Sequence, residues 1–320
     1  MIFDFKKQRV DCHNNFPNRV LFKTEEKFHK LIEKNNGSTP FKPIKLNYDT
    51  DKTFQTCVGH LGDGLEFLPY RPDYMFDHCF KVVDEAGKSH FNSSSGVKGI
   101  VQGIGEKLLA AEKKDWSDII SSLCSVLPVI TARFIVKRIF ESEEIRIASP
   151  RDKKASLAKR AKACFNSQQY EKFIDKYIFK EKEGKRVYCK ELAENPKVQL
   201  NAAKFIIMLL NDMEGKKIKS NYKELDLTIA SNHIPINKKS EFITSVILYN
   251  IRNERAHGST LSPFRTSKSD ISRYQGYYFS MLCTYIFSLG LFQLRNYGGI
   301  SASEIKSCCI KNVSLQKDFF

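Results

Sequence analysis

Residues 240–258 read SEFITSVILYNIRNERAHG, an apolar stretch that ends in polar and charged residues. Its large apolar side chains recur at the three- and four-residue spacing of one helix face: Phe242, Ile243, Val246, Ile247 and Ile251. This spacing predicts a helix over 239–256 that buries one side and has a polar, basic end.

A second long helix is expected soon after the first. The connection of residues 258–267 contains Pro263, and from Asp270 to about residue 290 apolar and aromatic side chains again follow helical spacing. Two long helices joined by a short connection pack antiparallel, which is the unit of an up-and-down bundle. We therefore expect a mainly α-helical protein whose C-terminal part is such a bundle.

The N-terminal region is expected to be small and α+β. Alternating apolar and polar residues predict short strands at 44–48 and 54–58, before a turn formed by Gly62, Asp63 and Gly64. Pro72 favours the first position of a helix, which is expected to end at Gly87.

An internal boundary is expected at 89–105, a serine- and glycine-rich segment that ends with Gly99, Gly103 and Gly105. Helices are predicted beyond it at 104–114, 116–142, 152–181 and 197–214. The chain then divides into an α+β region of unknown role (1–95), a basic helical region (96–190) and the bundle (191–320).

Composition narrows the class of protein. With 320 residues, 42% of them hydrophobic, the chain is long enough to bury a sizeable core. The longest apolar runs, 205–210 and 285–292, are far shorter than the roughly 20 residues of a membrane span. Asp4 and Lys6 interrupt the apolar residues at the N-terminus, so this segment does not resemble an export signal. A cytoplasmic location is therefore expected. Nine cysteines without a CxxC pair predict reduced, mostly buried thiols.

The positive charge is concentrated in the middle of the chain. The formal net charge is +16, and residues 133–190 hold 17 basic and 8 acidic residues, a net of +9. A polyanion partner explains such an excess, and we expect an RNA-binding surface that includes Lys153, Lys154, Lys159 and Arg160. The alternative is a solvated, lysine-rich helical face. Composition alone does not separate RNA from DNA.

The polar end of the 239–256 helix carries the strongest motif. Residues Arg252 to His257 read R-N-E-R-A-H, which has the form R-N-x-x-x-H. In this setting the segment resembles the signature of the HEPN superfamily (higher eukaryotes and prokaryotes nucleotide-binding), over residues 197–290 only. The resemblance implies a helical bundle, usually dimeric. Proteins of this superfamily are often metal-independent ribonucleases of toxin–antitoxin, abortive-infection or type VI CRISPR defence. The resemblance therefore also implies an antitoxin or RNA partner that keeps the enzyme inactive.

The side chains of this segment suit RNA cleavage on chemical grounds alone, independently of the resemblance to the family. Cleavage of RNA by its own 2′-hydroxyl requires two proton transfers and neutralisation of phosphate charge, and no metal or other cofactor is essential. We expect Arg252 to bind the phosphate, His257 to transfer the proton, Asn253 to orient the histidine or a ribose hydroxyl, and Arg255 to add a phosphate contact.

One copy of the motif supplies a single histidine, so a homodimer is expected to provide the second. The apolar stripe, with Tyr274, Tyr277 and Tyr278, is a candidate dimer surface. A diverged second half-site is the alternative, formed by Arg71 and His78 in RPDYMFDH. It departs from the pattern at Pro72, and a histidine at the edge of the core is the simpler interpretation.

Two further alternatives stay open. The bundle and basic face also fit a non-catalytic RNA-binding or partner-binding scaffold, whereas a DNA-binding protein lacks a recognisable groove-reading motif. A zinc site could form from Cys57, His60, His78 and Cys79, but no second CxxC or HxxxH pair accompanies them, so no metal is expected.

Overall fold

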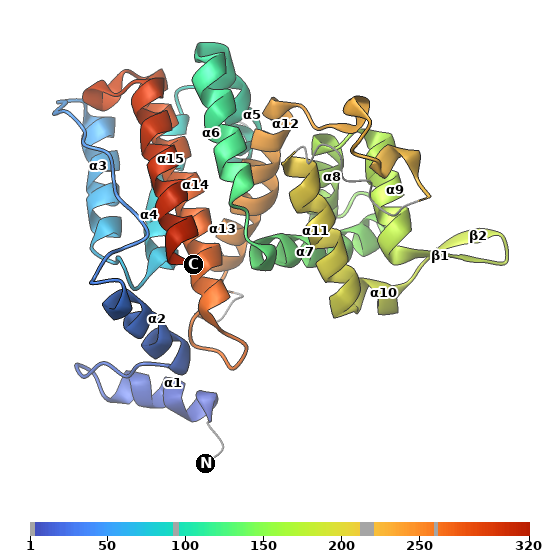
Figure 1. Ribbon diagram of the computed structural model, residues 1–320, viewed down its shortest axis with the longest axis horizontal. Helices are drawn as coiled ribbons and strands as arrows, with labels where there is room; N and C mark the ends of the chain where they lie inside the picture. Colours follow the sequence, from blue (N-terminus) through green and yellow to red (C-terminus); the bar gives the residue numbers. More distant parts are fainter. Residues whose placement is uncertain (1–3, 92–95, 212–220, 259–261) are drawn as a thin grey trace. The chain divides into compact units, whose positions relative to one another are not determined.

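The computed structural model describes residues 4–91, 96–211, 221–258 and 262–320, and this part of the chain is mainly helical (Figure 1). The residues group into two compact units, described separately below. Unit 1 combines Met1–Val97 with Ile251–Phe320, and unit 2 is Lys98–Asn250. The sequence suggested three consecutive parts, of which the third, 191–320, is shared between the two units.

Unit 1 is built around one long apolar helix, α14, which packs against α2, α4 and α15. Its helices are α1 (Phe5–Asn14), α2 (Lys23–Lys34), α3 (Lys52–Leu65), α4 (Pro72–Gly87), α14 (Ile271–Leu294), the short η6 (Tyr297–Gly299) and α15 (Ala302–Phe319); α13 (Tyr249–Ala256) enters this unit at Ile251. The predicted helix from Pro72 to Gly87 is confirmed at both ends, with the proline at its first position.

Aromatic side chains of α14 form the centre of this core. The ring of Tyr274 stacks between Phe28 and Phe264, with ring centres 3.8 and 3.9 Å away. Tyr278 is also buried and donates a hydrogen bond to the carbonyl of Pro69 at 2.6 Å. Tyr274 and Tyr278 were expected on a dimer surface; this was wrong, because the unit uses them for its own core.

α14 also has a property not expected from the sequence, since it is long and apolar enough to cross a membrane. Of its most apolar segment, 83% is buried inside the structure. Mostly buried core helices of soluble proteins share this length and apolar character.

The expected N-terminal strands are wrong in the part of the chain that the structure describes. Residues 54–58 belong to α3, because Phe54, Cys57 and Leu61 are buried at helical spacing. Residues 44–48 follow no regular structure; the backbone N–H of Ile44 donates to the Tyr285 hydroxyl at 3.0 Å, and that of Asn47 to the Gly298 carbonyl at 2.9 Å. These contacts with α14 and η6 replace a strand ladder.

Unit 2 is helical apart from one hairpin. Its elements are α5 (Gly96–Ala111, entering at Lys98), α6 (Lys113–Ser125), α7 (Val129–Ala148), η2 (Lys153–Ala155), α8 (Ser156–Cys164), α9 (Ser167–Ile178), β1 (Phe179–Lys182), β2 (Lys185–Tyr188), α10 (Lys190–Glu194), α11 (Pro196–Leu210), η3 (Lys223–Leu225), η4 (Ala230–Asn232), α12 (Ile236–Glu241) and the π-helical segment η5 (Phe242–Leu248).

Several predicted helices in unit 2 are shorter than expected. The 116–142 helix divides before Pro128, and the 152–181 segment contains η2, α8, α9 and the start of the hairpin. The two-residue turn, Glu183 and Gly184, has positive φ at both positions, 53° and 71°, which matches a tight hairpin. α11 confirms most of the 197–214 helix, whose last residues, 212–214, lie outside the described residues.

The glycines assigned to a flexible boundary are helical instead. α5 begins at Gly96 and includes Gly99, Gly103 and Gly105. A Cβ atom on Gly105 would overlap the hydroxyl oxygen of Ser240 in α12 and lie 2.5 Å from its Cβ. Gly105 therefore allows α5 and α12 to approach closely.

The predicted 239–256 helix is confirmed, although α12, η5 and α13 divide it. The apolar stripe from Phe242 to Ile251 is buried, so it is not the free dimer surface that was expected. Seven of the nine cysteines are buried, as predicted.

Candidate active site at the end of α13

The R-N-x-x-x-H residues lie in the last turn and a half of α13. The backbone N–H of His257 donates to the Asn253 carbonyl at 3.1 Å, which continues the helical pattern to the histidine. Gly258 then adopts a φ of +63°, a left-handed conformation that glycine tolerates and that ends the helix. The side chain of His257 is exposed. The local sequence thus presents a histidine at an exposed helix end.

Arg252 lines an open cleft between α13 and α4. The cleft has a volume of about 240 Å³ and is lined by Asp77, Phe80, Lys81, Asp84, Arg252, Arg255 and Ala256. The guanidinium of Arg252 donates to the side-chain oxygen of Asn253 at 3.3 Å and lies 6.0 Å from the Phe80 ring centre. Within the described chain, neither Arg252 nor Lys81 has a carboxylate at ion-pair distance. Both cations are therefore available to an anion.

Arg255 is committed to carboxylates of α4. Its Nε donates to Asp77 Oδ1 at 2.7 Å, its Nη2 pairs with the other oxygen of Asp77, and its Nη1 donates to Asp73 Oδ2 at 3.2 Å. Burial alone lowers the pKa of Arg255, but its hydrogen bond to Asp77 and the charges of both aspartates outweigh burial and raise it. These pairs argue against the phosphate contact expected of Arg255 and make it the anchor of α13 on α4.

This anchoring role gives a stability prediction. Arg255→Ala leaves Asp73, whose side chain is 1% exposed, with Arg71 alone, and Asp77 without a partner. Because Arg71 and solvent compensate in part, we expect a loss of about 2 kcal/mol, below the values for fully buried pairs. Thermal unfolding followed by circular dichroism measures it. Arg252→Ala on the same helix serves as the matched control and should change stability little; equal losses would contradict the distinction.

The alternative half-site of Arg71 and His78 is not assembled. Arg71 forms a bidentate pair with Asp73, at 2.9 and 2.8 Å, and its guanidinium lies 3.8 Å from the Tyr74 ring centre. His78, seven residues further and about 10 Å along the helix axis, faces α3. Burial and the charge of Lys81 lower the pKa of His78. The two side chains therefore have separate neighbours.

The basic residues expected to bind RNA divide into two kinds. Lys153, Lys154 and Lys159 are exposed in unit 2. Arg160 is only 6% exposed, and its Nε donates to the carbonyl of Ser245, within the π-helical segment, at 3.0 Å. Its predicted place on an RNA-binding surface is wrong, because the guanidinium stabilises the interior of unit 2.

The structure also brings together part of the zinc site considered from the sequence. His60 and His78 lie side by side, whereas Cys57 and Cys79 are buried, with burial raising the pKa of Cys57 to about 11. Asp63, which was assigned to a turn, joins the two histidines. Its signal was the three-residue spacing from His60, which places both on one helix face.

Comparisons of the chain with protein-family models, with curated proteins and with solved structures found no match. A function for the chain therefore depends on its own residues and their geometry. The available geometry is an arginine in an open cleft, with no ion pair among the described residues, and an exposed histidine five residues later at the end of the same helix.

Proposed function

We propose that the protein is an endoribonuclease of the HEPN type, which cleaves RNA through attack of the 2′-hydroxyl without a metal ion. One observation carries the proposal: among the described residues no carboxylate lies at ion-pair distance from Arg252, although Asp77 and Asp84 also line its cleft, and the exposed His257 follows at the end of the same helix. The contrast with Arg255, which is fully paired, separates a structural arginine from one that can bind a ligand.

The reaction assigns a task to each group. His257 takes the proton of the 2′-hydroxyl, the 2′-oxygen forms a bond to phosphorus, and the bond from phosphorus to the 5′-oxygen breaks. A second acid gives a proton to that leaving oxygen. Arg252 offsets the added negative charge on the phosphate oxygens in the transition state, and Asn253, which accepts its hydrogen bond, orients it. The products are a 2′,3′-cyclic phosphate and a 5′-hydroxyl.

A two-fold dimer supplies the second acid in this proposal. His78 faces α3, so unit 1 does not offer it to the cleft. Two copies that meet at the exposed ends of α13 would place two arginines and two histidines around one phosphate. Because Tyr274 and Tyr278 are in the core, exposed residues around His257 must make this contact.

The RNA would dock in addition on Lys153, Lys154 and Lys159, through contacts with its phosphates. A toxin or abortive-infection role in the cytoplasm, silenced by an antitoxin or RNA partner, completes the proposal by analogy with the family that the motif resembles.

The direct test is cleavage of single-stranded RNA by the wild-type protein in excess EDTA. We expect fragments with 2′,3′-cyclic phosphate and 5′-hydroxyl ends, whereas a DNA strand of the same sequence stays intact because it lacks the attacking hydroxyl. Cleavage that EDTA eliminates, or equal cleavage of the DNA, would contradict the proposal. RNA binding without any cleavage would favour the non-catalytic scaffold.

A further inference from the structure

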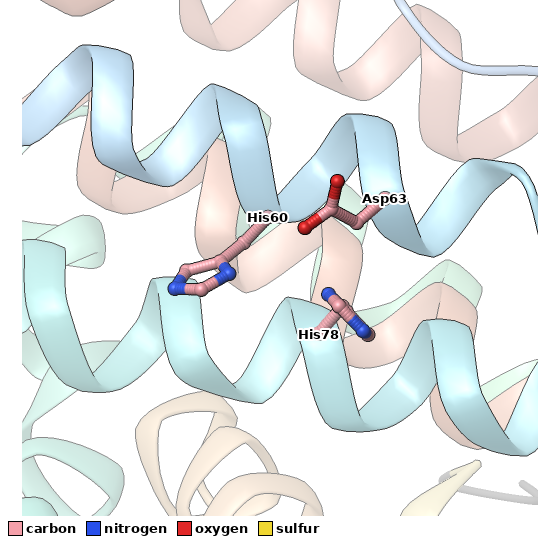
Figure 2. A group of neighbouring side chains, drawn as sticks. All are labelled: His60, Asp63 and His78. Atoms are coloured by element: carbon pink, nitrogen blue, oxygen red, sulfur yellow. The ribbon is translucent and has the colours of Figure 1, made fainter.

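Three side chains that can bind a metal ion meet between α3 and α4. His60 and Asp63 extend from α3 and His78 from α4, and Figure 2 shows the three directed toward one another. One ligand atom from each lies within 4.8 Å of the other two. The two histidines are half-buried, while Asp63 is exposed, so the cluster is open to solvent on one side.

The sequence of α3 produces this arrangement locally. His60 and Asp63 are three residues apart and share one face of the helix. The next residue, Gly64, is buried, and a Cβ there would overlap the sulfur of Met75 and lie 3.0 Å from the Cβ of His78. The glycine thus lets α4 approach closely at the point where His78 must reach the α3 residues.

His78 has an unsatisfied atom in this place. Its Nδ1 is buried, and within the described chain it has no hydrogen-bond partner. A buried ring nitrogen without a partner is costly, because folding removes it from water without replacing the lost hydrogen bond. A metal ion bound to the cluster would give this buried histidine the partner that it lacks.

We propose that His60, Asp63 and His78 bind a divalent transition-metal ion, with Zn²⁺ as the test ion. Two imidazoles and one carboxylate suit zinc and similar first-row metals, whereas Ca²⁺ and Mg²⁺ prefer oxygen ligands alone. Zinc–ligand bonds of about 2.0–2.1 Å place neighbouring ligand atoms about 3.3 Å apart, so small side-chain rotations close the cluster around the ion.

The coordination leaves at least one position open. Three protein ligands with an exposed carboxylate leave room for water or a substrate group, as in open zinc sites. Lys81, one turn beyond His78, is exposed, and its flexible side chain can keep its charge in solvent. Asp77 and Lys81 line the α13 cleft, whereas His78 faces α3, so the metal site is separate from the arginine cleft.

Titration calorimetry with Zn²⁺ on the untagged protein tests the site. We expect one ion per chain with an affinity that falls at least about tenfold in His60→Ala, Asp63→Asn and His78→Ala. His13→Ala, an exposed histidine on α1, is the matched control and should bind as the wild type does. Asp63→Asn keeps the shape of an exposed side chain, so its result does not depend on altered folding.

Cobalt distinguishes this site from binding to the cysteines. Bound Co²⁺ should give the visible absorption bands of a cobalt ion with a low coordination number, without a charge-transfer band from a thiolate ligand. These visible bands should disappear in Asp63→Asn. No stoichiometric binding to the wild type, binding unchanged in all three variants, or a thiolate band that accounts for the signal would overturn the proposal. RNA cleavage is not measured here, so failure leaves the assignment of Arg252 and His257 unaffected.

Discussion

His257→Ala is expected to lower the rate of RNA cleavage by about 10³-fold or more, because the histidine performs the proton transfer and both copies are lost in a dimer. Stability should change by less than about 0.5 kcal/mol, since the side chain is exposed. Initial rates on a single-stranded RNA in EDTA, with circular dichroism on the same sample, measure both effects. His13→Ala removes another exposed histidine from the last turn of a helix and should leave the rate unchanged.

Mixed dimers extend this test to the shared site. Arg252→Ala and His257→Ala proteins should each lose nearly all activity, because each homodimer lacks one of the two residue types. Their mixture should recover a small part of it, because a heterodimer holds one intact arginine and one intact histidine, although it still lacks the second histidine of the full mechanism. Light scattering of the wild type should give about twice the chain mass of 36.9 kDa. Full activity in a strictly monomeric protein, or undiminished cleavage by His257→Ala, would refute the two-fold mechanism.

Helices with strong local signals could be predicted from the sequence. Pro72 at a favoured first position, followed by apolar residues at helical spacing, indicated α4 from end to end. The same spacing indicated a helix over the residues of α12, η5 and α13. No local sequence signal indicated that η5, in the middle, is π-helical. The burial of Arg160 at Ser245 also depends on tertiary packing, and charge composition alone could not show it.

The N-terminal strands were wrong because two periodicities overlap. Phe54, Thr56 and Val58 alternate with polar residues, yet Phe54, Cys57 and Leu61 follow the helical spacing that the core uses. That choice also hid Asp63, which reads as a turn between two glycines but lies one turn after His60 in a helix. If residues 52–65 are assigned to a helix, the three-residue spacing of His60 and Asp63 shows that both lie on one helix face.

The candidate active site shows the same division between local and tertiary information. Its R-N-x-x-x-H residues are contiguous, so the sequence indicated them directly. Their roles depend on α4, which lies far away in the chain: Asp73 and Asp77 bind Arg255, whereas Arg252 forms no ion pair within the described part of the chain. No spacing rule within α13 separates the two arginines.

The second large effect concerns the close approach of α5 and α12. Gly105→Ala should destabilise unit 2 by about 3 kcal/mol, because the new methyl group overlaps the fully buried Ser240, and overpacked cores lose more than the roughly 1 kcal/mol that alanine gains in a helix. Trp116 is the only tryptophan of the chain and is buried in α6, which packs against α12. Its fluorescence in urea therefore reports on this unit.

Ser240→Gly makes the test specific to this contact. It removes both overlapping atoms and leaves only the Ser240 Cα, 3.8 Å from the new methyl group, at an ordinary packing distance. On its own it should cost about 1 kcal/mol as a glycine inside a helix. Combined with Gly105→Ala it should restore most of the lost stability, so the two changes are strongly non-additive. Gly59→Ala, in α3 with open space around the position, is the control and should not destabilise. Additive losses in the double variant would mean that Gly105 and Ser240 do not touch, and that the helix leading to the R-N-x-x-x-H residues has another register.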